Sequence, residues 1–383
     1  MMRILLFLFS NNFFSFANYI AFFMLGYEVF INRRIALVKV KTPAFLFLVV
    51  GSLAFMTISM YNGYDLTSST FCLRFIVPIL LFYIGYTRGM KGFESLKVDV
   101  YWISFATFIH GFLNVITNRN VNILTIAGRQ YQDIYGGPIS ATLQNLFFVL
   151  SSALFFYFLV YEKRKSLKII GVFATLGGVY GSIANASRTL LYVTVLIFIM
   201  CLFLHLVLTH NIASGIIRGI IVVCGILLIV FTIMWLDLFG VQEWFVNTAL
   251  GQRELTSVVR NSISQNSRWV YAGDILELLP QYPLGNMPYN HFAHNLWVDI
   301  AKETGVIPFI LYIAFVIAAL FEGGKYFFNV KGESEKAIFI AAIIVAHVLV
   351  FFTEPIMEGS PLMFAIFCFI VGGVSSLTKN MGT

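Results

Sequence analysis

The sequence carries little charge for its length. Only 11% of its 383 residues are Asp, Glu, Lys or Arg, whereas 59% are apolar, and soluble globular proteins are about 25% charged. This composition excludes an ordinary soluble domain. Several apolar runs reach the roughly twenty residues that cross a bilayer as a helix. We therefore expect an all-α, multi-pass membrane protein, whose net charge of +7 does not indicate a nucleic-acid partner.

Features of redox, zinc and repeat proteins are also lacking. The four cysteines lie in or beside apolar runs and form no Cys-x-x-Cys pair, so we interpret them as small core residues. No repeat or low-complexity segment is found. The start, "MMRILLFLFS", resembles a signal peptide, but no small-residue cleavage site follows it. This predicts a retained first span.

The apolar runs predict eleven spans, near 4–31, 43–60, 71–88, 99–117, 139–160, 168–185, 188–208, 216–239, 294–320, 337–353 and 361–377. The first run is interrupted by "SNNFFSFAN", so a short hairpin there, and hence twelve spans, is the alternative. On this basis residues 1–239 form a transmembrane bundle of eight or nine spans. Residues 240–293 form a large external loop bearing short helices, and residues 294–383 hold three C-terminal spans.

Positive charge alternates between the loops. Lys and Arg gather in 32–41, 87–97, 161–168, 322–336 and the C-terminal tail, and these segments alternate with 61–70, 118–138, 186–187, 240–293 and 354–360. Cytoplasmic loops carry an excess of positive residues, so the first set is expected inside and the second outside. The C-terminus is then inside. The N-terminus is outside with eleven spans and inside with twelve.

Almost every positive residue on the expected outer side is an arginine. Lys302 is the one lysine, and the arginines are Arg74, Arg119, Arg129, Arg188, Arg253, Arg260 and Arg268. Lysine would keep a loop in water equally well, whereas a planar guanidinium holds two phosphate oxygens at once. The bias indicates an outward-facing phosphate or pyrophosphate site, with ordinary ion pairs as the alternative.

The large loop holds two predicted helices. In "SRWVYAGDILELLP" the apolar residues Trp269, Ala272, Leu276 and Leu279 recur at helical spacing, and "VQEWFVNTAL" predicts a second short helix. Both are expected to lie along the membrane surface. Aromatic residues of the loop and the next span either form platforms for sugar rings or an interfacial belt: Trp244, Trp269, Tyr271, Tyr282, Tyr289 and Trp297.

His294 and Asn295 open the predicted span that follows the loop. On a straight helix Glu303 lies on the side opposite His294, so we expect His294 to act alone at the mouth of the span and Glu303 to be buried. An imidazole suits proton transfer because its pKa lies near working pH; local hydrogen bonding is the alternative. His291 and His294 have no further ligands at metal-site spacing.

Four stretches follow one another between about residues 180 and 377: "ANASRTLLYVTVLIF", "NSRWVYAGDILELLPQYPLGN", "AHNLWVDIAKETGVIPFILYI" and "TEPIMEGSPLMFAIFCFIVGG". In this order they resemble parts of the O-antigen ligase and polymerase family. These parts are its small-Ser-Arg span start, its loop arginine followed by an aromatic residue and a Pro-x-Gly turn, its His-Asn…Glu-x-Gly signature, and its penultimate loop with the last span. Asn286 stands where that family often has a second glycine. The N-terminal half matches only in hydropathy.

The resemblance implies a membrane glycosyltransferase with a GT-C-like helical bundle in the bacterial inner membrane, its active site facing the periplasm. Arg188 and Arg268 match the family's functional arginines and His294 its essential histidine. The substrate would be an undecaprenyl-pyrophosphate-linked oligosaccharide, without a metal or nucleotide cofactor. Further candidate substrate-binding residues are Arg129, Arg253, Arg260, Trp269, Tyr289, His291 and Asn295.

Arg188 stands at the head of the apolar run "SRTLLYVTVLI", where burial of a guanidinium in hydrocarbon would cost several kcal/mol. We therefore expect it to face a wet cleft and to bind the lipid-linked pyrophosphate. The expected function is polymerisation of O-antigen or capsular repeat units, with a chain-length regulator as a candidate partner protein. The alternatives are the ligase of the same family, a flippase for lipid-linked oligosaccharides, and a membrane protein without catalysis.

Overall fold

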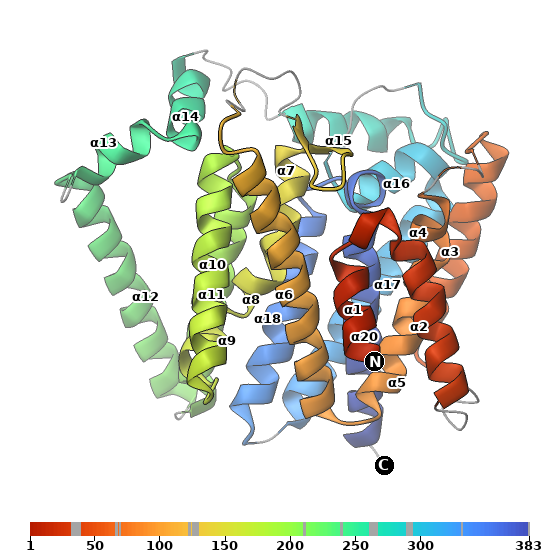
Figure 1. The fold of residues 1–383 in the computed structure, drawn as a ribbon, viewed down its shortest axis with the longest axis horizontal. Coiled ribbons are helices and arrows are strands. Elements are labelled where there is room, and N and C mark those ends of the chain that lie inside the picture. The colour runs from red at the N-terminus through yellow and green to blue at the C-terminus, as the bar shows by residue number, and fades with distance from the viewer. Residues whose placement is uncertain are drawn as a thin grey trace. The chain divides into compact units, whose positions relative to one another are not determined.

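A computed structural model describes residues 1–31, 40–65, 68, 70–121, 124, 130–209, 212–237, 240–259, 267–288, 294–330 and 332–381. Eight helical segments in these ranges are long and apolar enough to cross a membrane (Figure 1). They are α3 (Pro43–Tyr61), α6 (Phe93–Thr117), the broken segment Ala141–Val160, α10 (Lys165–Ala184), α11 (Thr189–Thr209), α17 (Val306–Asn329), α18 (Ser334–Phe351) and α20 (Pro361–Met381). The predicted all-α, multi-pass membrane class is confirmed, while the total of eleven or twelve spans stays a prediction.

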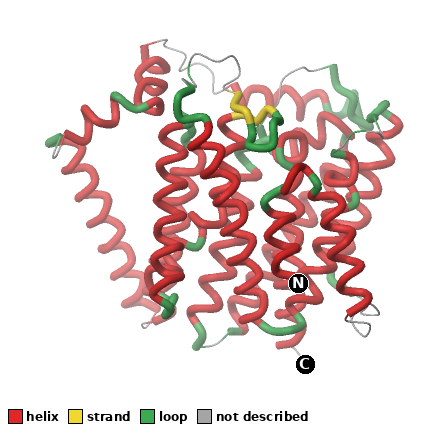
Figure 2. Tube along the Cα trace, in the orientation of Figure 1, coloured by secondary structure: helices red, strands yellow, loops and turns green. Residues whose placement is uncertain are grey.

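The other elements are shorter or only partly described. They are α1 (Met2–Ser10), η1 (Phe13–Ser15), α2 (Ala17–Ile31), α4 (Phe71–Phe75), α5 (Val77–Gly89), α7 (Ala141–Gln144), η3 (Asn145–Phe148), α8 (Val149–Ala153), α9 (Phe155–Val160), α12 (Ile212–Trp235), α13 (Val241–Val246), α14 (Ala249–Val259), α15 (Ser267–Leu278), α16 (Leu296–Thr304) and α19 (Ile356–Gly359). The strands β1 (Gln130–Gln132) and β2 (Pro138–Ser140) form one antiparallel hairpin (Figure 2). The run predicted as a span at 71–88 is divided into α4 and α5 at Ile76. Pro78 lies in the first turn of α5, because proline lacks the N–H that a helix interior needs.

The chain folds as two compact units. The first comprises residues 1–107, 265–329 and 347–383, and the second comprises 108–264 and 330–346. The division falls within α6 and within α18.

Close contact between α5 and α20 forms the centre of the first unit. An 18-residue stretch of α20 is fully buried. Glycines allow the two backbones to touch, since a Cβ at Gly85 would lie 2.9 Å from Phe369 Cα, and one at Gly89 would lie 2.9 Å from Ser376 Cβ. Small residues at four-residue spacing are the usual means of close helix packing in membranes. The helices α3 and α17 pack beside this pair.

The first apolar run is a helical hairpin. Arg3 at the start of α1 and Arg88 at the end of α5 both bind the buried Asp99, with Arg88 Nε 2.6 Å from Oδ2 and Arg3 Nε 3.2 Å from Oδ1. Glu28 near the end of α2 lies 3.9 Å from Arg88. The hairpin therefore begins and ends at the Arg88 end of this unit, as the twelve-span alternative requires. Its helices, roughly 14 Å and roughly 22 Å long, are shorter than the hydrocarbon core.

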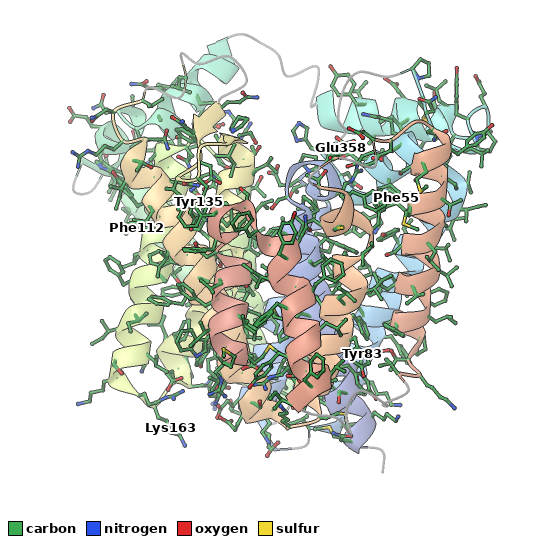
Figure 3. All side chains as sticks on the ribbon, turned by 45° about the vertical axis from the view of Figure 1, so that its right-hand side comes forward. Phe55, Tyr83, Phe112, Tyr135, Lys163 and Glu358 are labelled. Atoms are coloured by element: carbon green, nitrogen blue, oxygen red, sulfur yellow. The ribbon has the colours of Figure 1, made fainter. Side chains whose placement is uncertain are left out.

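In the second unit α10 packs against α8, α9 and α11, and α12 packs against α11. Glycines again allow this, because Gly178 and Gly181 of α10 lie against the ring of Phe148. Lys163 precedes α10 at one end of the unit, and Tyr135 of the β-hairpin lies at the other end (Figure 3). The lysine-rich segment 161–168 and the turn that carries Arg188 are thus separated by the length of α10.

Candidate functional site

Arg188 lies on a strained turn between α10 and α11, not within the apolar helix. Asn185 caps α10, and Ala186 has a left-handed backbone, with φ of 51°, which costs an L-residue about 1–2 kcal/mol. The turn is closed by the N–H of Ser187, which donates to Ser182 O at 2.9 Å. The side chain of Arg188 is 43% exposed.

The loop helix α14 covers this turn. Glu254 accepts a hydrogen bond from Arg188, with Nη1 3.1 Å from Oε2, and Arg253 donates to the carbonyl oxygen of Ala186. Ala249 packs against the buried cluster that contains Ala186. The structure therefore brings two of the predicted phosphate-binding arginines, Arg188 and Arg253, to one short stretch of backbone, and it pairs the first of them with a carboxylate.

The β1–β2 hairpin supports the same turn from another side. The Tyr131 hydroxyl of β1 donates to Asn185 Oδ1 at 2.5 Å, and the ring of Tyr131 is buried against Ala141 and Ala186. The hairpin thereby anchors Asn185 and Ala186, which precede Arg188 in the turn.

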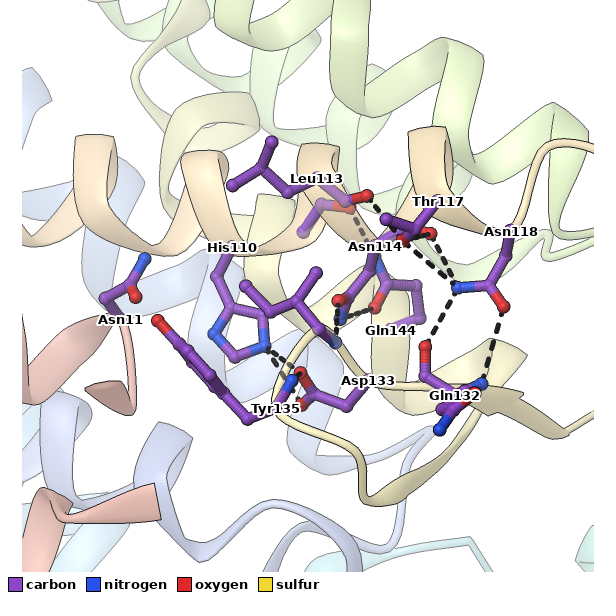
Figure 4. A network of polar contacts seen from close by, with 12 residues as sticks. Asn11, His110, Leu113, Asn114, Thr117, Asn118, Gln132, Asp133, Tyr135 and Gln144 are labelled. Carbon is purple, nitrogen blue, oxygen red and sulfur yellow. Dashed lines mark hydrogen bonds and ion pairs between the residues drawn. The ribbon is translucent and has the colours of Figure 1, made fainter. Parts of the chain in front are cut away.

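Polar side chains of α6 and of the residue that follows it, at four-residue spacing, hold the hairpin (Figure 4). His110 Nε2 lies 3.0 Å from both carboxylate oxygens of Asp133, Asn114 Oδ1 accepts from the N–H of Ile134 at 2.8 Å, and Asn118 Nδ2 donates to Gln132 O at 2.9 Å. These residues were not among the predicted site residues. The available signal was the four-residue repeat of His110, Asn114 and Asn118 along and just beyond an apolar helix.

The pKa of Asp133 lies below its ordinary value. Burial of this carboxyl raises the pKa, but the hydrogen bond and charge of His110 and the backbone N–H groups of Tyr135 and Ile134 lower it by more. Asp133 is therefore ionised at neutral pH, and the hairpin is held by a charge-assisted contact.

His294 belongs to the first unit and precedes a short helix, which corrects the prediction of a span over 294–320. The helix α16 ends at Thr304, because Gly305 has φ of 77° and ψ of −157°, and the span α17 begins at Val306. His294 has φ of 53°, a strained conformation of the kind that clusters at functional sites.

Asn295 caps α16. Its Oδ1 accepts from the N–H groups of Trp297 and Val298 at 3.1 and 3.2 Å, and Asp299 Oδ2 accepts from the N–H of Asn295 at 3.1 Å. The carbonyl oxygen of this side chain is thus used by the backbone. Trp297 is buried against Phe352, with ring centroids 4.3 Å apart, so it offers no surface to a sugar.

A buried carboxylate that was not among the predicted site residues lies beside His294. Glu354, just beyond the end of α18, is fully buried, and its Oε2 is 4.0 Å from His294 Nδ1. The histidine side chain is 31% exposed. A buried negative charge beside an accessible imidazole stabilises the protonated imidazole. The two residues are sixty positions apart, so no local pattern linked them.

The C-terminal half of α16 carries further charges. Glu303, expected to be buried, has a side chain that is 21% exposed; it forms an ion pair with Arg74. Lys302 Nζ lies 4.0 Å from Glu358 Oε1. Burial raises the pKa of Glu358 to about 7; Lys302 and Arg74 partly offset this, whereas Asp299 and Glu303 act with it. Glu358 lies at the end of the first unit opposite Tyr83 (Figure 3).

The Pro-x-Gly turn and the Glu-x-Gly signature meet in space. Asn286 N donates to Glu303 O at 3.1 Å, and a Cβ on Gly305 would overlap the backbone of Pro283. Asn286 itself has φ of 53°. Asparagine tolerates this region better than most residues, which explains how it stands where the resembling family often has glycine.

The helix predicted in "SRWVYAGDILELLP" is α15 (Ser267–Leu278) and packs against α16, but its buried face is shifted. Ala272 is buried as expected, whereas Ile275 is buried in place of Leu276, which is 43% exposed. Arg268 and Trp269 lie in the first turn of this helix, α15, and their side chains lie outside the described part of the chain. Residues Arg129, Arg260, Tyr289 and His291 lie outside the described residues altogether.

The arrangement thus brings together Arg188 with Arg253 in one unit, and His294 with Asn295 in the other. No group of three His, Cys, Asp or Glu side chains in the described ranges has the geometry to hold a metal ion. Comparison with models of protein families finds no match for this chain, and no curated protein sequence matches it significantly.

Proposed function

We propose that this protein is a membrane glycosyltransferase that polymerises undecaprenyl-pyrophosphate-linked oligosaccharide repeat units at the outer face of the bacterial inner membrane. The observation that carries the proposal is the meeting of Arg188 and Arg253 at one strained turn, under a loop helix and at the end of an apolar span. Two guanidiniums at the membrane boundary suit a lipid-linked diphosphate, whose charges must stay in water while its lipid stays in the bilayer.

Within each unit, taken by itself, the charge distribution supports an outward-facing position for the candidate residues. In the second unit the Arg188 turn lies at the end of α10 remote from the lysine-rich segment 161–168. In the first unit His294 and Glu354 lie at the end remote from Arg88 and the C-terminus. By the positive-inside rule, both ends face outward.

In the proposed reaction the arginines, the histidine and the buried carboxylate have separate roles. The hydroxyl of the acceptor sugar attacks the anomeric carbon of the donor. The bond from that carbon to the pyrophosphate oxygen breaks, and the oxygen keeps the electron pair. Arg188 and Arg253 stabilise the charge that develops on the leaving pyrophosphate, and loss of one such fixed donor costs about 10²–10³ in rate. By the resemblance, His294 would take the proton of the hydroxyl, and Glu354, whose Oε2 lies 4.0 Å from its Nδ1 within the first unit, would stabilise the imidazolium that results.

Glu254 acts as a placeholder in this scheme. Its carboxylate pairs with Arg188, with Oε2 3.1 Å from Nη1, and the pyrophosphate replaces it on binding. Glu254→Gln is therefore expected to lower KM for the lipid-linked donor, because the guanidinium no longer has to release a charged partner.

The proposal is tested with purified protein and a synthetic lipid-linked repeat unit, with the products separated as a ladder on a gel. Arg188→Ala and Arg188→Lys are expected to lose about 10²–10³ of the rate, since lysine keeps the charge but not the fork. Arg164 is the matched control: it also pairs with one carboxylate, at 3.1 Å, but lies at the opposite end of α10. Arg164→Lys should leave the ladder unchanged.

Three outcomes contradict the proposal in distinguishable ways. Unchanged ladders in both Arg188 variants would remove the arginine from the reaction. Transfer of a finished chain to lipid A core, without elongation, would identify the ligase. Movement of the lipid-linked repeat across vesicles without conversion would identify a transporter.

A further inference from the structure

Two polar atoms beside Arg188 are buried without hydrogen-bond partners in the described part of the chain. They are Asn185 Nδ2 and Ser187 Oγ, and each residue is 1% exposed. A buried donor left unpaired costs folding free energy, and nearly all such groups in proteins are satisfied. Two of them, flanking one strained residue next to a guanidinium, point to a ligand that supplies the missing acceptors.

The hydrogen bond from Tyr131 determines which atom of the Asn185 amide remains available. The hydroxyl donates to Oδ1 at 2.5 Å, so the carbonyl side of the amide is occupied and the NH₂ side is left to donate. The Tyr131 ring is held in the apolar cluster, and the β-hairpin that carries it is held by α6. The donor direction of Asn185 is therefore fixed by residues outside the turn.

We propose that Asn185 Nδ2 and Ser187 Oγ are neutral donors to phosphate oxygens of the ligand that binds Arg188, and that Tyr131 is the positioning residue for this pair. The inference rests on the proposed function, since it takes a pyrophosphate to be that ligand. The neighbouring guanidiniums of Arg188 and Arg253 favour phosphate oxygens over neutral sugar hydroxyls. Both atoms are buried, so the proposed binding requires α14, which covers the turn, to move when Glu254 leaves Arg188.

Measuring both the melting temperature and the Kd for pyrophosphate distinguishes a ligand-binding role of Ser187 from a structural one. Ser187→Ala removes a hydroxyl that has no partner, so the melting temperature should stay equal or rise, while the Kd for inorganic pyrophosphate should increase about ten-fold. Ser182 is the matched control, because its buried hydroxyl donates to Asn145 Oδ1 at 3.2 Å. Ser182→Ala should lower the melting temperature and leave the Kd unchanged.

A negative charge placed at position 185 gives a second test. Asn185→Asp keeps the acceptor for Tyr131 but replaces the NH₂ donor by a carboxylate oxygen, so pyrophosphate binding should weaken by more than about ten-fold. Asn247→Asp, on the exposed C-cap of α13, introduces the same charge without touching the turn and should bind as wild type does. Tyr131→Phe keeps the buried ring, frees the amide and should raise the Kd about three-fold to ten-fold.

The inference and the proposed function fail differently. If wild type elongates lipid-linked repeats and binds pyrophosphate, but Ser187→Ala and Asn185→Asp bind as tightly, the neutral donors are wrong and the function stands. If Ser187→Ala lowers the melting temperature as Ser182→Ala does, the hydroxyl is structural and the inference is overturned. If wild type neither elongates nor binds pyrophosphate, both are overturned.

Discussion

Replacing Gly305 by alanine should separate α16 from the turn that follows α15. Gly305 has φ of 77°, and a Cβ there would overlap the carbonyl group of Pro283 and lie 2.7 Å from Gly285 N. These neighbours are backbone atoms, which cannot rotate aside as a side chain can. The turn and the end of α16 must therefore move apart.

The cost has two parts. A non-glycine residue in this conformation is strained by about 1–3 kcal/mol. Separation also breaks three backbone hydrogen bonds: Val306 N to Pro283 O at 3.0 Å, Asn286 N to Glu303 O at 3.1 Å and Met287 N to Lys302 O at 3.3 Å. At about 0.5–1.5 kcal/mol each, their loss brings the expected total for Gly305→Ala to about 2.5–7.5 kcal/mol.

Gly332 supplies the control. It also has φ of 77°, but a Cβ there would have nothing within 4 Å, so Gly332→Ala should show the strain alone, about 1–3 kcal/mol. The assay is unfolding of each purified variant by SDS in mixed micelles, with free energies taken relative to wild type. Equal losses for Gly305→Ala and Gly332→Ala would refute the backbone contact as the reason for a glycine at 305.

Three further changes test other parts of the structure. Glu354→Gln should lower kcat up to about 100-fold by removing the charge that stabilises protonated His294, and Glu354→Asp should recover part of it; a Gln variant with wild-type kcat would contradict this role. The pKa of Glu358 is raised from 4.5 to about 7, so the folded state binds its proton more tightly, and the free energy of unfolding should fall as pH rises from about 4.5 to 7. Glu358→Gln should flatten this slope and stabilise the protein at pH 8 by up to about 3 kcal/mol; an unchanged pH–stability curve would count against the shift. Asn286→Gly should keep wild-type stability within about 0.5 kcal/mol in the same SDS titration, because φ there is already 53°; a loss above about 1 kcal/mol would mean that the asparagine side chain is needed.

Much of the helical architecture could be read from hydropathy. The runs at 43–60 and 361–377 match α3 (Pro43–Tyr61) and α20 (Pro361–Met381) closely. The reason is that a chain in hydrocarbon must satisfy its backbone hydrogen bonds within each segment, so an apolar run of this length has little choice but a helix. A predicted helix boundary was wrong where a single residue ends a helix within an apolar run, as Gly305 does within the run 294–320.

The candidate site was readable only in part. Arg188 and His294 stood out because a charged or titratable side chain at the end of an apolar run is costly unless it faces water or a partner. Their neighbours did not stand out: Glu254 lies 66 positions from Arg188 and Glu354 lies 60 from His294. Periodicity reports only which residues share one face of one element, so it carries no information about such pairs.

The sequence by itself determined the membrane class, the positions of most helices and the presence of arginines where lysine would have served for solubility. Only the tertiary structure decided that the first apolar run folds back on itself, that Tyr131 meets Asn185, and that Gly285 and Gly305 let two distant segments touch. The physical reason is the range of the interactions. Hydropathy and helix formation act between residues within a turn or two, whereas these contacts depend on how whole helices pack against one another.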